Sequence, residues 1–74
     1  MQKDKEKIAM NIILKTLKLK KNKISLNTSL GSIPEWDSLA HLNIFMNLNT
    51  LFKKIDIKKA SKVVTIKDWL KLVK

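Results

Sequence analysis

Glycine and proline occur only once each in the 74 residues, as Gly31 and Pro34. An all-β domain needs many tight turns, and tight turns draw heavily on these two residue types. Hydrophobic residues make up 45% of the chain and charged residues 30%, which is typical of a folded rather than a disordered protein. The sequence therefore predicts an all-α domain.

The length of the chain limits what else it can contain. We expect a single domain over residues 1–74. Because cysteine is absent, neither a disulfide nor a thiolate metal ligand is available. With one histidine and six carboxylates, we expect no dedicated metal site. We also expect no enzymatic activity, because so small a domain leaves little room for an active-site pocket and offers few catalytic groups.

Two long segments carry apolar residues at the spacing of a helix. The first covers residues 3–19. The second begins near Ser38, follows the favourable N-cap residue Asp37, and ends at the lysines of positions 53–54. The apolar faces predicted from this spacing contain Ile8, Met10, Ile12, Ile13, Leu14, Leu17 and Leu19 in the first helix, and Leu42, Ile44, Phe45, Leu48, Leu51 and Phe52 in the second.

The remaining segments are predicted to be a long loop and two shorter helices. Residues 20–37 are rich in Asn, Ser and Thr, as loops are, and we expect their regularly spaced apolar residues to hold the loop against the core. Asp56 is expected to cap a short helix. Thr65 followed by Asp68 resembles a capping box at the start of the last helix. We interpret Trp36 and Trp69 as packing anchors.

The formal net charge of +10 suggests a negatively charged partner, such as a nucleic acid, an anionic membrane or an acidic protein. However, all sixteen basic residues are lysines, and arginine is the residue that grips phosphate with two parallel hydrogen bonds. A coding bias towards Lys, Ile and Asn would give the same composition. We therefore favour a solvated lysine-rich surface over a dedicated polyanion site.

The most unusual stretch of the chain runs from Pro34 to Leu42. It places Ser38 in the first turn of an apolar helix, directly after Asp37 and at the end of the long loop. The N-terminus of a helix offers free N–H groups and partial positive charge, which suit a phosphate group. From the Asp-Ser-Leu triplet alone, a simple helix cap is the better interpretation.

Over nearly all of its length, the chain resembles the acyl carrier protein family, the small phosphopantetheine-binding carriers. The segments Ser29-Leu30-Gly31 and Trp36-Asp37-Ser38-Leu39 resemble the family's approach to its modified serine. The apolar residues of the second predicted helix and of positions 64–73 are similar to the family pattern, and the tryptophan before Asp37 is more similar to specialised stand-alone carriers. The resemblance implies a four-helix bundle with three main helices, one short helix and a long first loop.

This resemblance also implies a function. Ser38, flanked by Asp37 and Leu39, would carry 4′-phosphopantetheine through a phosphodiester, and a phosphopantetheinyl transferase would attach it. The arm would hold acyl or aminoacyl groups as thioesters for separate enzymes of fatty acid or secondary metabolite biosynthesis. An apolar space between the helices would shelter the cargo. We accordingly expect a cytoplasmic monomer whose partners are the loading and transferring enzymes, with neither a nucleic acid nor a membrane as partner.

The second helix departs from the family pattern in its charge. Family members typically carry acidic residues there, but no carboxylate lies between Leu39 and position 54 of this chain. The residues we expect to face partner enzymes are Ala40, His41, Asn43 and Met46, with Leu39 beside them. We do not expect His41 to act as a base for Ser38, because no third member of a catalytic triad is visible.

Two alternatives to a carrier remain open at this stage. The first is a small basic helical module that binds nucleic acid or anionic lipid, which the net charge alone supports. The second is a carrier-like docking protein whose Ser38 is never modified.

Overall fold

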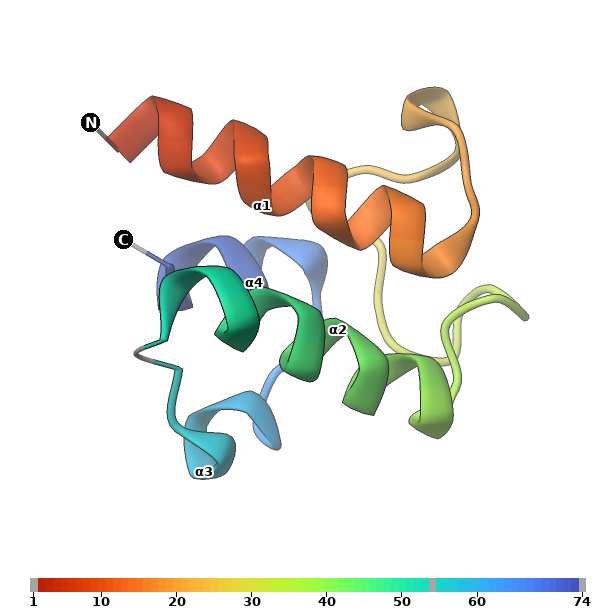
Figure 1. Cartoon of the computed structure of the whole chain (residues 1–74). Helices are drawn as coiled ribbons and strands as arrows, with labels where there is room; N and C mark the ends of the chain where they lie inside the picture. Colours follow the sequence, from red (N-terminus) through yellow and green to blue (C-terminus); the bar gives the residue numbers. More distant parts are fainter. Residues whose placement is uncertain (1, 54, 74) are drawn as a thin grey trace.

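The two long helices form because each presents a narrow apolar stripe to the other. Ala9, Ile13 and Leu17 recur every four residues along α1 (Gln2–Leu17), and all three are buried. They contribute to the same core as Ile44 and Leu48 of α2 (Ser38–Phe52). The computed structural model describes residues 2–53 and 55–73, and it shows α1 and α2 packed along each other (Figure 1).

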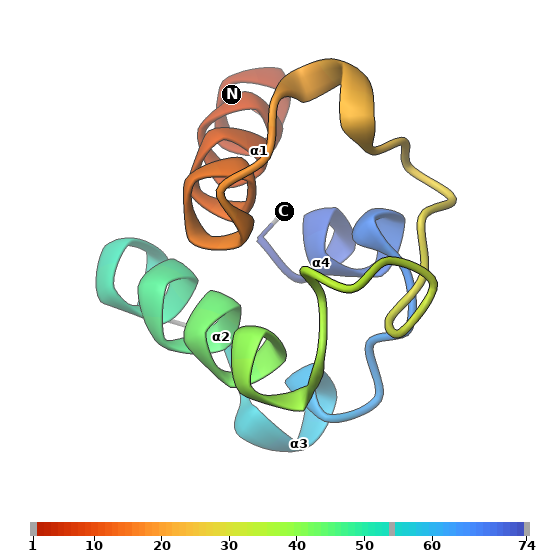
Figure 2. The same ribbon diagram turned by 90° about the vertical axis from the view of Figure 1, so that its right-hand side faces the viewer.

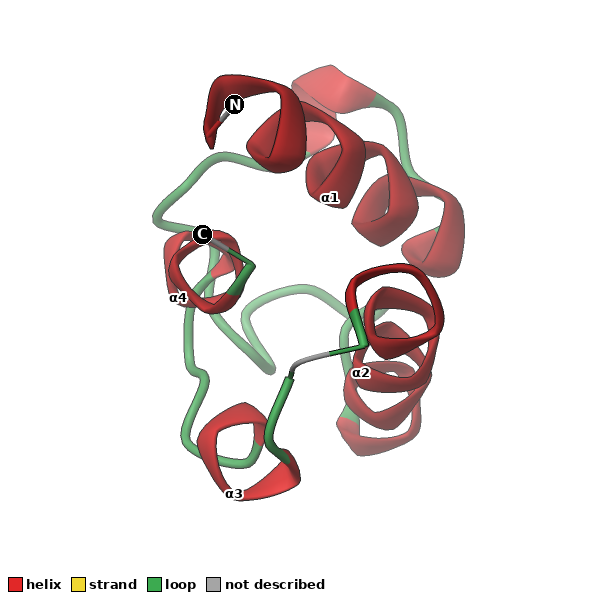
Figure 3. Cartoon of the chain, turned by 60° about the vertical axis from the view of Figure 1, so that its left-hand side comes forward, coloured by secondary structure: helices red, strands yellow, loops and turns green. Residues whose placement is uncertain are grey.

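Three short helices complete the fold. The 3₁₀ helix η1 (Lys21–Lys23) lies in the long loop, α3 (Ile57–Ala60) follows α2, and α4 (Ile66–Leu72) closes the chain. Helix α4 packs against α1 and α3, while α3 lies at the end of the molecule away from α1 (Figures 2 and 3). The described residues form no strand, only one isolated bridge between Ser29 and Thr65. The predicted all-α class is therefore confirmed.

Both long helices end at a lysine in the left-handed backbone conformation. At Lys18 (φ 59°), the Leu19 N–H donates to the Leu14 carbonyl and the Lys18 N–H to the Lys15 carbonyl, a Schellman arrangement. The first helix thus ends two residues before the predicted position 19. At Lys53 (φ 58°), the N–H donates to the Asn49 carbonyl, which confirms the predicted end of α2. Lys54 lies outside the described residues.

Three residues predicted to face the core are exposed: Ile8, Leu42 and Leu51. The predicted apolar faces were too wide. On α2 only Ile44 and Leu48 are fully buried, and Ala40, Phe45 and Phe52 are half-buried against the core. Leu42 lies on the side of α2 that faces away from the core, and Leu51 lies in the last turn of the helix, so both side chains meet solvent.

The long loop is ordered by hydrogen bonds to the segment that starts α4. The Leu30 N–H donates to the Val64 carbonyl at 2.7 Å, and the Thr28 carbonyl accepts from the Ile66 N–H at 3.1 Å. Ile24 and Ile33 pack against the core as expected, whereas Leu26 and Leu30 are exposed. Backbone hydrogen bonds hold this part of the loop in place, so the side chains of Leu26 and Leu30 do not need to be buried.

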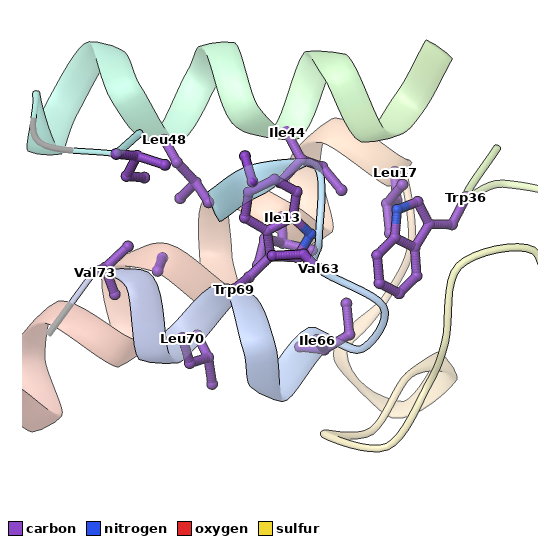
Figure 4. Packing of buried hydrophobic residues seen from close by; sticks show 13 residues of the cluster. Ile13, Leu17, Trp36, Ile44, Leu48, Val63, Ile66, Trp69, Leu70 and Val73 are labelled. Atoms are coloured by element: carbon purple, nitrogen blue, oxygen red, sulfur yellow. The ribbon is translucent and has the colours of Figure 1, made fainter. Parts of the chain in front are cut away.

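Trp36 and Trp69 are fully buried, which confirms their predicted role as packing anchors (Figure 4). They bring the long loop and α4 into one core with α1 and α2.

Along residues 2–53 and 55–73, no helix is long and apolar enough to cross a membrane. In the same ranges, no three His, Asp or Glu side chains form a group suited to a metal ion.

The predicted capping box at the start of α4 is present. The Thr65 hydroxyl accepts from the Asp68 N–H, and the Asp68 carboxylate accepts from the N–H groups of Val64 and Thr65. These two backbone donors are the main reason that the pKa of Asp68 lies below its ordinary value. The ionised form of Asp68 therefore stabilises the fold.

We expect Asp68→Asn to destabilise the protein more at neutral than at acidic pH. A carboxylate whose pKa is lowered by folding contributes stability above its unfolded pKa, and that contribution is lost as the pH falls through the folded value. Urea unfolding of both proteins between about pH 6 and about pH 3 measures the difference. A difference in unfolding free energy that stays constant over this range would contradict the assigned role of the charge.

Candidate functional site

The junction between the long loop and α2 presents Ser38 to solvent. Asp37 is the N-cap of α2, and its carboxylate accepts a hydrogen bond from the Ala40 N–H at 2.9 Å. Ser38 is the first helical residue, and its exposed hydroxyl has no hydrogen-bond partner among the described residues. By their position in the first turn, the Ser38 and Leu39 N–H groups have no intrahelical acceptor. A free hydroxyl therefore stands at the positive end of a 15-residue helix.

The backbone before Ser38 is fixed by a compact turn. The Gly31 N–H donates to the Trp36 carbonyl at 3.0 Å, and the Trp36 N–H donates to the Ile33 carbonyl at 3.2 Å. Gly31 has φ +85°, a left-handed conformation that glycine adopts without strain. The only glycine of the chain thus occupies a position where the turn requires one, and the turn delivers Trp36 to the core two residues before Ser38.

His41 connects this turn to the rest of the fold. Its ring lies nearly parallel to the ring of Trp36, at an interplanar angle of 14° and with centroids 5.9 Å apart, and its centroid is 4.8 Å from that of the Trp69 ring. The Trp36 indole N–H donates to Nδ1 at 3.1 Å, so Nδ1 must be an unprotonated acceptor. The proton is then on Nε2, which donates to the Ala60 carbonyl at 2.9 Å. One imidazole therefore ties the turn before Ser38 to the end of α3.

The His41 side chain, which we expected to face partner enzymes, is turned into the fold. The side chain is half-buried, and both nitrogens are engaged within the fold. This geometry also gives it no free lone pair with which to act as a base for Ser38. A sequence signal for the inward orientation exists, since His41 precedes the buried Ile44 and Leu48 by three and seven residues, the spacing of one helix face.

Ser38 lies at the edge of an apolar pocket between α2 and α3. The pocket has a volume of about 210 Å³ and is lined by Ser38, His41, Leu42, Phe45, Ile57, Ala60 and Ser61. Leu42 and Phe45 come from α2, whereas the other wall comes from α3 and the residue after it. The α3 residues were missed by sequence reasoning because only the tertiary fold brings them to Ser38. A second hollow between α1 and α2, of about 290 Å³, includes none of these residues.

The remaining residues expected to face partners divide into two groups. Asn43, Met46 and the neighbouring Leu39 are exposed on α2. Ala40 is half-buried and packs against the core, so it offers less surface than expected. Neither Met46 nor Asn43 lines the pocket beside Ser38.

The charge around the site is uneven. Glu35 and Asp37 are exposed on the loop before Ser38, while α2 itself carries no carboxylate and no lysine. Exposed lysines follow at positions 53, 58, 59 and 62.

Comparison of the chain with family models, with curated proteins and with solved structures finds no match.

Proposed function

We propose that this protein is a carrier whose Ser38 bears a 4′-phosphopantetheine arm. The observation that carries the proposal is the position of Ser38: an exposed hydroxyl at the N-terminus of a long helix and at the rim of an apolar pocket. The resemblance of residues 29–39 to the acyl carrier protein family supports the same residue. The order of two long helices, a short third and a closing fourth fits the four-helix arrangement of that family.

The residues around Ser38 suit an attached phosphodiester. The hydroxyl is accessible to an enzyme, and the first N–H groups of α2 provide donors and partial positive charge for a phosphate. Asp37 holds the first turn of the helix in place through its bond to the Ala40 N–H. The Trp36–His41 hydrogen bond fixes the preceding turn, so the serine is presented on a rigid support.

The attachment step balances with coenzyme A as donor. The Ser38 oxygen forms a bond to the phosphorus next to the pantetheine, the phosphoanhydride bond breaks, and 3′,5′-ADP leaves. The serine proton passes to a base of the transferase, because His41 has no nitrogen available. When bound, the arm supplies a thiol that carries acyl or aminoacyl groups as thioesters.

The pocket beside Ser38 suits an apolar cargo. Leu42, Phe45 and Ile57 contribute hydrocarbon surface, and the Ser61 hydroxyl is already bonded to the Lys58 carbonyl. These side chains would exclude water from a chain folded back along α2. At about 210 Å³, the pocket is smaller than typical drug-sized sites of about 300–1,000 Å³.

We expect a phosphopantetheinyl transferase supplied with coenzyme A to convert the purified chain to a single heavier species. Intact mass spectrometry would show the gain of one phosphopantetheine per chain. The control omits coenzyme A. If several transferases of different specificity give no conversion, the carrier proposal fails and a docking protein with an unmodified Ser38 is favoured.

A further inference from the structure

The two hydrogen bonds of the His41 ring exist in only one protonation state. Nδ1 accepts from the Trp36 indole N–H at 3.1 Å, and Nε2 lies 2.9 Å from the Ala60 carbonyl oxygen. An indole N–H can only donate and a carbonyl oxygen can only accept, so the imidazole must be neutral, with its proton on Nε2. The bond to Ala60 joins α2 to the end of α3. The contact between these two helices therefore depends on the charge of one side chain.

Helix α3 has little of its own structure to hold it in place. It is four residues long, and Ala60 is its buried residue, whereas Ile57, Lys58 and Lys59 are exposed. A helix this short is not stable by itself. Besides the packing of α3 against α4, the bond from His41 fixes its position. The pocket of about 210 Å³ lies between α2 and α3, so a displacement of α3 widens it.

We propose that His41 is a pH-sensitive switch, and that protonation of its Nδ1 releases the end of α3 and opens the pocket. The Nδ1 lone pair takes a proton from solvent, and the new N–H then points at the Trp36 indole N–H. Two donors cannot bond to each other, and the fully buried Trp36 is left with an unsatisfied N–H, which is costly. Rotation of the imidazole relieves this conflict and also breaks the bond to Ala60. Histidine is the side chain that ordinarily changes charge between about pH 5 and about pH 8.

The surroundings of His41 do not supply another acceptor for the new proton. The side chains that line the pocket with it are uncharged, and α2 carries no charged residue. The Trp69 ring attracts a cation through its face but cannot restore the bond that Trp36 loses. Asp37 and Asp68 keep their negative charges as capping residues, and no hydrogen bond joins either carboxylate to the imidazole. The other charged residues on the surrounding elements are exposed, namely Glu35 in the loop, Lys58, Lys59 and Lys62 in and after α3, and Lys67 and Lys71 in α4.

NMR of the unaltered chain tests the switch directly, because His41 is the only histidine and Trp36 and Trp69 are the only tryptophans. The signals of the ring nitrogens show which of them carries a proton between about pH 8 and about pH 5. We expect the proton on Nε2 at the upper end of this range. As Nδ1 becomes protonated, the Trp36 indole signal should shift, and its exchange with water should become faster relative to that of the buried Trp69 indole.

Binding of the neutral dye Nile red tests whether the pocket opens. We expect binding to become several-fold tighter between about pH 8 and about pH 5, with an unchanged helical circular dichroism spectrum. Shifts in the signals of Leu42, Phe45 and Ile57 would place the dye in the pocket beside Ser38. In His41→Gln the side chain does not titrate, so the dye should bind equally well at both pH values. Glu35→Gln removes an exposed titratable group near Trp36 and should retain the full pH response.

Several results would overturn the proposal. They are a proton on Nδ1 at about pH 8, an imidazole that stays neutral down to about pH 5, or a Trp36 indole signal that does not respond to the titration. An equal pH response of dye binding in His41→Gln would assign the opening to carboxylates instead. If His41→Gln does not fold, the imidazole and indole signals of the unaltered chain decide alone. Ser38 is unmodified in all of these measurements, so the switch and the carrier proposal fail separately.

Discussion

Ser38→Ala should abolish phosphopantetheine transfer completely, whereas Ser61→Ala should leave it intact. Both serines line the same pocket, which makes them a matched pair. The Ser61 hydroxyl donates to the Lys58 carbonyl at 2.8 Å, but the Ser38 hydroxyl is free of partners among the described residues and lies at the start of α2. Only Ser38 combines an available nucleophile with the positive end of a long helix. Intact mass after incubation with transferase and coenzyme A gives the result directly.

The two variants also test whether the pocket or the helix terminus selects the serine. A mass gain in the Ser38→Ala protein, mapped to Ser61 or to a serine of the loop, would show that the assignment to Ser38 is wrong. Circular dichroism of both variants provides the folding control. Since Ser38 is exposed and Asp37 supplies the cap, Ser38→Ala should retain the helical spectrum of the parent.

Trp69→Ala should leave the protein largely unfolded at room temperature. Trp69 is fully buried among residues from α1, α2 and the end of α3, and it contacts the ring of His41 (Figure 4). Removing a buried tryptophan costs about 3–5 kcal/mol. A domain of this size rarely has more than about 3–5 kcal/mol of stability in total. Loss of the far-ultraviolet helical signal and of dispersed amide resonances would show the effect.

Trp69→Phe provides a milder comparison at the same position. The Trp69 indole N–H is buried and has no hydrogen-bond partner among the described residues. Phenylalanine removes that unsatisfied donor together with part of the ring, so the two effects partly offset each other. We expect a folded protein with a moderately lowered melting temperature. If Trp69→Ala melted at the same temperature as the parent, Trp69 would not be the anchor that the packing indicates.

The sequence predicted the features that depend on neighbouring residues. Asp37, Asp56 and Thr65 all act as N-caps, because capping needs only a suitable side chain two or three residues before the N–H group that it binds. The capping box with Asp68 was predictable for the same reason. The start of α2 at Ser38, which determines the candidate site, follows from the Asp37 cap.

The features that depend on distant residues were not predictable in this way. Ile57 and Ala60 reach the pocket of Ser38 only because α3 folds back against α2, about twenty residues along the chain. The bond between His41 and the Ala60 carbonyl depends on the same tertiary contact. The early end of α1 at Lys18 was missed for another reason, because lysine is not among the residue types that favour the left-handed conformation.

If the proposed function holds, Ser38 carries a phosphopantetheine arm in the living cell. The most direct test is the intact mass of the protein purified from its native source, followed by mapping of the modified peptide. We expect a chain heavier by one phosphopantetheine, alone or with a thioester-bound cargo, and a modified peptide that contains Ser38. A chain of unmodified mass, or a modification that maps to any other serine, would contradict it.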